Sequence, residues 1–185
     1  MKKVASCRLA AIGACALLGS CTPVIEFAPP AQKQAPQGHE HVTPIVRNQL
    51  LMEDSDANGF IDQDVEPASP GYVLRWTNAH PRFRLWPDGT AGREIRLRFQ
   101  LLPETVSVTG PVTVSITVNS RKVAAPVFSV PGWCDYSHPV PDELLAGSRP
   151  ALVGLDVSPV FTQKADGSKL GIYLYAIGLT KAPAP

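Results

Sequence analysis

The sequence predicts an all-β protein: a single antiparallel β-sandwich or jelly-roll-like domain that follows a signal peptide and a disordered tether. Three observations support this prediction. From residue 67 nearly to the C-terminus, short runs alternate apolar and polar side chains, proline and glycine separate these runs, and no long helical pattern interrupts them. The domain is expected over residues 67–181, which is an ordinary domain size.

Six runs are expected to form strands: residues 82–86, 94–101, 112–119, 122–130, 151–159 and 169–180. The first two place arginines opposite apolar residues, which predicts one solvated face. Residues 112–119 and 122–130 are separated by a short turn and are expected to pair as a hairpin, with Pro126 at an edge or a bulge. The run 169–180 is apolar on both faces, so it is expected at the centre of a sheet.

The beginning of the chain predicts a lipoprotein signal peptide over residues 1–20. Lys2 and Lys3 precede an apolar run that ends in small residues and is too short to span a membrane stably. The tetrapeptide Leu18-Gly19-Ser20-Cys21 resembles the lipobox of bacterial lipoproteins, in which the cysteine thiol is acylated before cleavage. Cys21 is therefore the expected lipidation site, and through its lipid the chain is expected to be anchored in the bacterial cell envelope.

The sequence allows two alternatives to cleavage before Cys21. A second lipobox-like match ends at Cys15, but it would leave a shorter apolar core than signal peptides normally have. An ordinary cleaved signal with a coincidental cysteine is the other alternative. Thr22 follows Cys21 where an aspartate would retain the protein at the inner membrane of enteric-type bacteria, so the outer membrane is the expected location.

Two segments are expected between the signal and the sandwich. Residues 21–43 are rich in proline, alanine and glutamine and predict a flexible tether. Residues 44–66 predict a short helix followed by an acidic loop, because Ile45, Val46, Leu50 and Leu51 have spacings that fit one or two helical turns after Pro44.

The charge of the chain gives information about its possible partners. Removal of the leader takes away three of the 17 Lys and Arg and none of the 16 Asp and Glu, which leaves a formal charge of −2 and gives no support to a nucleic-acid partner.

Only Cys134 remains besides the lipidated Cys21, so no disulfide can form within one chain. Cys134 is expected as a small buried hydrophobe. Its neighbours Asp135, Ser137 and His138 are not read as a catalytic triad, because triad members meet through the fold.

The stretch 52–66 resembles half of a calcium-binding loop. The oxygen ligands would come from Asp54, Asp56, Asn58, the Phe60 carbonyl, Asp62 and Glu66. Val65 stands where a bidentate glutamate should close the shell, and Pro67 blocks the helix that should follow. An acidic, solvated connector is the favoured interpretation, with no cofactor. A looser calcium (Ca²⁺) loop closed by Asp64 or Glu66 is the alternative, and it would stiffen the junction.

The runs "GYVLRWTNAHPRFRL", "REIRLRF", "VTVSITVNSRKV", "VFSVPGW", "HPVPDELLAG", "ALVGLDVSPVF" and "DGSKLGIYLYAIGL" occur in this order. Over residues 59–180 they resemble a β-sandwich module found in bacteria beside glycosyltransferases and in cell-surface polysaccharide proteins. The resemblance implies a carbohydrate-binding-like or architectural domain that is not an enzyme. The hairpin "VNSRKV" departs from the family pattern, because it lacks a glycine after the asparagine.

The residues themselves also predict no enzyme. The chain contains no Gly-x-Ser-x-Gly elbow, phosphate loop or zinc-binding helix motif. Carboxylates for a glycosidase pair are numerous enough, but most lie in predicted turns, where solvated carboxylates are expected: Asp88, Glu94, Glu104, Asp135, Asp142 and Glu143. A hydrolase is therefore the least favoured function.

A sugar-binding site on a sandwich needs aromatic faces and a few polar groups. The best candidates are Trp133 and Tyr136 for stacking, in an expected Pro-Gly-Trp turn, with Asp135, His138 and Arg82 as polar partners; Trp76, Trp86 and Arg75 are further candidates. Trp76 is expected in the core.

The arginine rows allow a second interpretation. Arg82 and Arg84 would form one positive face with Arg96 and Arg98 if their strands are neighbours, although such a row is usually only a solvated face. A third class of function is assembly with an envelope protein. Exposure of Trp133 and Tyr136 around a concavity would favour glycan binding, and burial of both would favour assembly.

Overall fold

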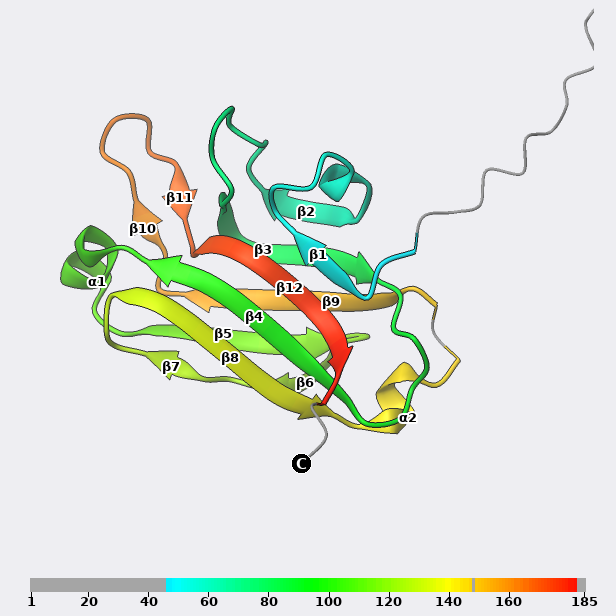
Figure 1. The fold of residues 1–185 in the computed structure, drawn as a ribbon. Coiled ribbons are helices and arrows are strands. Elements are labelled where there is room, and N and C mark those ends of the chain that lie inside the picture. Colours follow the sequence, from blue (N-terminus) through cyan, green and yellow to red (C-terminus); the bar gives the residue numbers. More distant parts are fainter. Residues whose placement is uncertain (1–45, 148, 183–185) are drawn as a thin grey trace, which may run out of the picture. The chain divides into compact units, whose positions relative to one another are not determined.

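The computed structural model describes residues 46–147 and 149–182 (Figure 1). The predicted signal peptide, Cys21 and the tether lie outside these residues. The strands are β1 (Gln49–Leu51), β2 (Ile61–Val65), β3 (Arg75–Leu85), β4 (Arg93–Leu101), β5 (Val112–Val118), β6 (Arg121–Ala124), β7 (Val127–Phe128), β8 (Gly132–Val140), β9 (Ala151–Ser158), β10 (Phe161–Thr162), β11 (Lys169–Leu170) and β12 (Tyr173–Lys181). The helices are η1 (Ala57–Gly59), α1 (Pro103–Thr109) and α2 (Asp142–Leu145).

The main strands pair antiparallel in the order β6-β5-β9-β3-β12-β4-β8. The long strand β3 connects two layers, because its residues 75–76 pair with β12 and its residues 82–85 pair with β9. We call β1, β12, β4 and β8 the front sheet, and β2, β3, β9, β5, β6 and β7 the back sheet (Figure 1). The predicted all-β antiparallel sandwich is confirmed.

The core lies between the two sheets and is built by strict alternation. In β5 all four apolar side chains are buried: Val112, Val114, Ile116 and Val118. In β4, Ile95, Leu97 and Phe99 point inward while Arg96 and Arg98 point outward. The Phe99 ring meets Phe128 of β7 edge-on at 4.9 Å, which joins the front sheet to the back sheet. Burial of each such side chain contributes about 1.5–3 kcal/mol.

Three detailed predictions hold. Strands β5 and β6 form the expected hairpin, with Val118 opposite Arg121. Pro126 lies between β6 and β7, where it interrupts one edge of the back sheet. Strand β12 is central, with partners on both sides.

The short helix predicted near residues 44–51 is wrong. Residues 49–51 form β1, which pairs with β12 so that Gln49 lies opposite Gly178. Strand β1 approaches closely at Gly178: a Cβ there would lie 3.1 Å from the Asn48 carbonyl oxygen. The free edge of β12 and the full burial of Leu50 outweigh the local helical pattern.

The acidic stretch also belongs to the sandwich. Its second half forms β2, which pairs with β3 in the back sheet. Met52, Ala57 and Phe60 are buried in the core. The sandwich of the described chain therefore begins at Gln49 and not at residue 67. Among residues 46–147 and 149–182, no helix has the length and apolar character needed to cross a membrane.

Candidate functional site

Strand β8 carries the predicted sugar-binding residues Trp133, Asp135, Tyr136 and His138. Trp133 lies inside this strand and not in a turn, because β8 pairs with β4 along its whole length. Side chains alternate between the two faces of a strand, so Trp133 and Asp135 lie on the outer face. Tyr136 and His138 point to the opposite side, where their rings stack with centres 6.3 Å apart. The predicted cluster of four residues is thus split between two faces.

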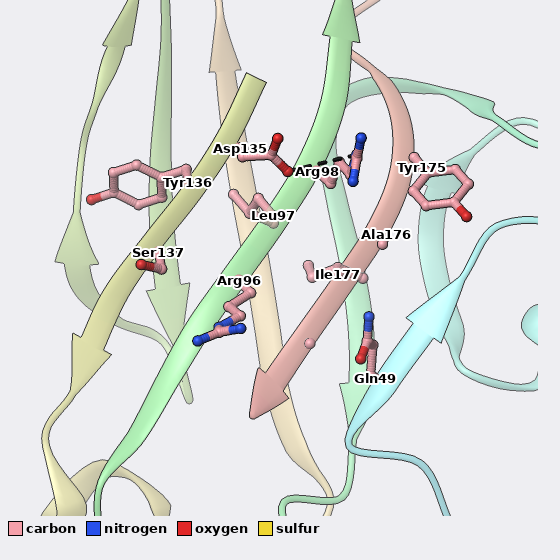
Figure 2. A pocket seen from close by; sticks show the side chains of 11 residues that line it. Gln49, Arg96, Leu97, Arg98, Asp135, Tyr136, Ser137, Tyr175, Ala176 and Ile177 are labelled. Carbon is pink, nitrogen blue, oxygen red and sulfur yellow. Dashed lines mark ion pairs between the residues drawn. The ribbon is translucent and has the colours of Figure 1, made fainter. Parts of the chain in front are cut away.

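A groove of about 420 Å³ lies on the outer face of the front sheet (Figure 2). Its floor is made by two small residues of β12, Ala176 and Gly178. Arg98 lies opposite Ala176 and Arg96 opposite Gly178, both on β4. Gln49 of β1 lies on the other side of Gly178. The groove exists because β12 presents small side chains between neighbours that carry long ones.

Tyr175 and Arg98, which line the groove, both contact Trp133, which lies beside it. Trp133 is 50% exposed, and its ring meets Tyr175 edge-on at 5.9 Å. The Arg98 guanidinium carbon lies 5.1 Å from the centre of the Trp133 ring and 5.8 Å from that of Tyr175. A cation over a ring face is attracted by the ring quadrupole, so Arg98 is held in place by both rings.

Tyr175 lies on this face two residues after Tyr173, as strand alternation requires. The register between β12 and β4 shifts between Leu174 and Ala176, so β12 has one extra residue there. This β-bulge brings Ala176 to the same face, where it lies opposite Arg98. Tyr175 was not identified from the sequence, because the run 169–180 reads as apolar on both faces.

The charges of the groove are balanced. The Arg98 Nε lies 3.6 Å from Asp135 Oδ1, and the Arg96 Nε lies 3.2 Å from Glu94 Oε2. Both contacts use the Nε, and the side chains of Arg96 and Arg98 remain 46% and 52% exposed. The outer Nη groups can therefore donate hydrogen bonds to a ligand in the groove. Two cations and two carboxylates favour a ligand rich in hydroxyl groups over a strong anion.

Arg82 and Arg84 lie on the back sheet, away from this groove. Their part of β3 pairs with β9, whereas β4 pairs with β12 and β8. The condition for a positive face of four arginines, that β3 and β4 are neighbours, is therefore not met. Arg84 donates to the Gly59 carbonyl oxygen at 3.3 Å. Arg82 borders a smaller hollow of about 180 Å³.

The other aromatic and arginine candidates have different environments. Trp76 is not in the core as expected: it is half-buried and stacks on Tyr173 with ring centres 4.8 Å apart. Trp86 packs against the core and meets Phe60 edge-on. Arg75 is buried and donates to the Met52 carbonyl oxygen at 2.8 Å. Burial lowers the pKa of Arg75.

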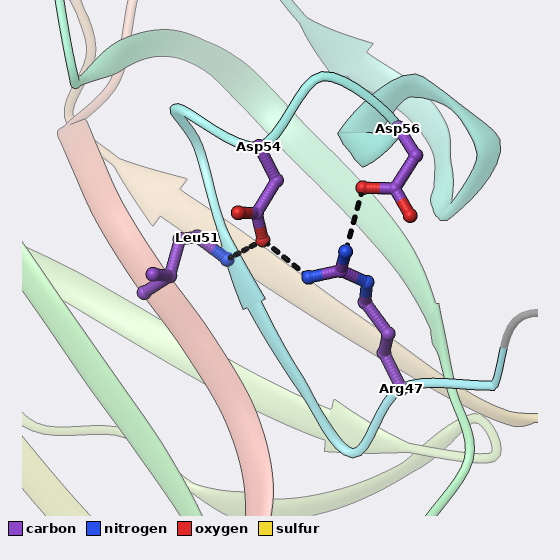
Figure 3. A network of polar contacts seen from close by, with 4 residues as sticks. All are labelled: Arg47, Leu51, Asp54 and Asp56. Atoms are coloured by element: carbon purple, nitrogen blue, oxygen red, sulfur yellow. Dashed lines mark hydrogen bonds and ion pairs between the residues drawn. The ribbon is translucent and has the colours of Figure 1, made fainter.

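Arg47 forms ion pairs with two aspartates of the acidic loop (Figure 3). Its Nη1 donates to Asp54 Oδ2 at 2.6 Å, and its Nη2 lies 2.9 Å from Asp56 Oδ1. Asp54 also accepts a hydrogen bond from the Leu51 backbone at 3.3 Å. One guanidinium thus bridges the first two predicted calcium ligands.

Three of the remaining predicted ligand groups have hydrogen-bond or ion-pair partners within the protein. Asn58 Oδ1 accepts from Arg75, and the Phe60 carbonyl oxygen accepts from the Arg84 backbone. Asp62 lies 3.9 Å from Arg84. The backbone nitrogen of Glu66 donates to the Trp76 carbonyl oxygen, at the end of β2. Within the described parts of the chain, no three His, Cys, Asp or Glu side chains gather as a metal-ligand group. Calcium binding stays a prediction, and it would require displacement of Arg47.

Cys134 is half-buried and packs against the core. Burial, and secondarily the charge of Asp135, raises the pKa of its thiol. A raised pKa lowers the thiolate fraction at neutral pH, as expected for a cysteine that serves packing.

The chain matches no family model. It also matches no curated protein in sequence. Among solved structures, the fold is similar to a family 35 carbohydrate binding module from Clostridium thermocellum, with a TM-score of 0.43 and 13% identity over 72% of this chain and 97% of that one. It is also similar to the CBM36-1 domain of a multidomain xylanase from the hindgut metagenome of Trinervitermes trinervoides, with a TM-score of 0.41 and 10% identity over 66% of this chain and 89% of that one. These likenesses concern the arrangement of the strands alone.

Proposed function

We propose that this chain is a non-catalytic carbohydrate-binding protein, and that glycan binds in the groove on the outer face of the front sheet. The observation that carries the proposal is the cluster of Trp133 with Tyr175 and Arg98, the last two of which line that groove. A pyranose ring has an apolar face that packs on an aromatic ring and hydroxyl groups that need planar polar partners. The cluster offers both within one surface.

The size and chemistry of the groove support this ligand class. Its volume of about 420 Å³ is within the range of roughly 300–1,000 Å³ that small-molecule sites have. Ser137 and Gln49 add a hydroxyl and an amide at its sides. The balance between arginines and carboxylates favours neutral sugars.

We propose further that the protein works in the bacterial cell envelope as a lipoprotein anchored through Cys21. Support for this comes from the Leu18-Gly19-Ser20-Cys21 tetrapeptide and the apolar run before it. A lipid at Cys21 and a proline-rich tether would present the sandwich to cell-surface polysaccharide. Trp133 is exposed beside the groove, whereas Tyr136 points to the opposite side, so exposure of this pair does not decide between glycan binding and assembly. The contacts of Trp133 with Tyr175 and Arg98 support glycan binding.

Affinity electrophoresis against soluble polysaccharides tests the proposal. The panel contains neutral xylan, mannan and mixed-linkage glucan, with acidic pectin and alginate for comparison. We expect retardation by at least one neutral polysaccharide, which Trp133→Ala abolishes and His138→Ala leaves unchanged, because His138 points away from the groove. Equal retardation of the wild type and of Trp133→Ala, or none with any of the five polysaccharides, would overturn it.

A further inference from the structure

We infer that the glycan-binding face extends beyond the groove across the front sheet to Trp76 and Tyr173, so that the ligand is a chain of several sugars. This inference rests on the proposed function and deepens it. The groove alone would fit a short glycan, whereas the longer face would select an internal stretch of polysaccharide.

The strand register places the aromatic residues in one row. Trp76 of β3 lies opposite Tyr173 of β12. Tyr173 lies opposite Gln100 of β4, which in turn lies opposite Trp133 of β8. Residues directly opposite in antiparallel strands have their side chains on the same face. The four side chains therefore form a row that crosses the strands on one face.

Burial confirms which face this is. The β4 neighbours of Gln100, Phe99 and Leu101, are buried in the core. In β3, Arg75 and Thr77 are buried, so Trp76 between them points outward. Gln100 and Trp76 therefore share the outer face that also carries Trp133.

The far end of the row is an aromatic platform. Trp76 and Tyr173 stack with an angle of 23° between their planes. Both rings are half-buried, so part of each ring remains exposed to solvent. Two aromatic side chains at the surface thus stand at the opposite end of the row from Trp133.

The length of the row determines the kind of ligand. Strands in a sheet lie about 4.8 Å apart, so three strand spacings separate Trp76 from Trp133 by about 14 Å. One sugar ring cannot contact both tryptophans. A chain of several rings can stack at both ends and meet the Gln100 amide in the middle.

The competing explanation is that the Trp76–Tyr173 stack only secures the junction between β3 and β12, as cross-strand aromatic pairs do. The two explanations differ in how affinity depends on ligand length. A purely structural stack affects ligands of every length alike, whereas a binding platform affects only those long enough to reach it.

Isothermal titration calorimetry with the disaccharide and the hexasaccharide of the best-bound neutral polysaccharide tests the inference. The variants are Trp76→Ala, Tyr173→Ala and Trp133→Ala, with Val108→Ala on α1 as the matched exposed control. Thermal melts accompany each titration. Tyr173→Ala removes the other half-buried ring of the platform and keeps the test valid if Trp76→Ala does not fold.

We expect Trp76→Ala and Tyr173→Ala to weaken hexasaccharide binding by about threefold to tenfold and to leave disaccharide binding unchanged. Trp133→Ala weakens both. Unchanged hexasaccharide affinity in every folded variant of Trp76 and Tyr173 overturns the extended face and leaves the groove proposal in place. Unchanged affinity for both ligands in Trp133→Ala overturns the groove itself.

Discussion

The guanidinium carbon of Arg98 lies 5.1 Å from the centre of the Trp133 ring. These residues belong to adjacent strands but are not directly opposite, since Arg98 pairs with Asp135 and Trp133 pairs with Gln100. Arg98 therefore reaches diagonally along the sheet, with Asp135 near its Nε and Tyr175 on its other side. The contact fixes a donor beside an aromatic surface, which is the arrangement that a sugar needs.

Replacement of Arg98 tests this contact. We expect Arg98→Met to weaken glycan binding by about 1.5–3 kcal/mol, the range of a hydrogen bond to a charged group, because the donor is lost while the aliphatic stem is kept. Arg98→Lys should restore part of the affinity through its charge. Calorimetry measures both, with Arg121→Met on the exposed end of β6 as the control. Full affinity in Arg98→Met would show that the groove does not use this donor.

Arg47 is expected to stabilise the acidic loop in place of a metal ion. Arg47→Met leaves Asp54 and Asp56 without their common partner, and we expect it to lower the free energy of unfolding by about 1 kcal/mol, since both ion pairs are partly exposed. Urea denaturation measures this change.

Calcium provides the complementary measurement. Millimolar calcium should leave the melting temperature of the wild type unchanged, because binding must first displace Arg47. A calcium-dependent rise in the melting temperature of the wild type would show instead that the loop is a metal site.

Strand β1 is expected to be an integral part of the domain. Leu50 is fully buried, so Leu50→Ala should lower the free energy of unfolding by about 2–5 kcal/mol, the usual cost of this truncation in a core. Val46→Ala, at a position that is 55% exposed, is the matched control and should have almost no effect. Equal stabilities of the two variants would place the start of the domain after β1.

Cys134 is expected to react slowly. Its pKa is raised by burial and by Asp135, so less thiolate is present at a given pH than for an ordinary cysteine of pKa about 8.5. Alkylation by iodoacetamide should reach half of its maximal rate above that pH, and Asp135→Asn should shift the profile to lower pH because it removes the negative charge. A profile centred at or below the ordinary cysteine value would contradict the packing role.

Much of the fold could be predicted because alternation reports directly on burial. Strands β4 and β5 place their apolar residues every second position, so one face had to be inside. The helix predicted near residues 44–51 was wrong because the few apolar residues there fit a helical turn and a short strand equally well. Only the free edge of β12, which is distant in sequence, decides between them.

The candidate site was only partly predictable. Trp133 was identified, but β8 carries polar or aromatic residues on both faces, so its alternation is hidden in the sequence. Trp76 was expected in the core because tryptophan is mostly apolar, yet the register of β3 turns it outward. Tyr175 lies in a run that reads as apolar on both faces, so the sequence does not show which face carries it.

The most direct measurement of the central claim is a chemical-shift titration of the isotopically labelled domain with the hexasaccharide of the best-bound polysaccharide. We expect shifts of the Trp133 indole N–H, of the Arg98 side-chain Nε–H and of the backbone amides of Gln49 and Tyr175. Signals of Gly154 and Asp156 on the back sheet should stay unchanged. Shifts confined to the back sheet or to the loops, with the Trp133 indole signal unchanged, would show that glycan does not bind in the groove.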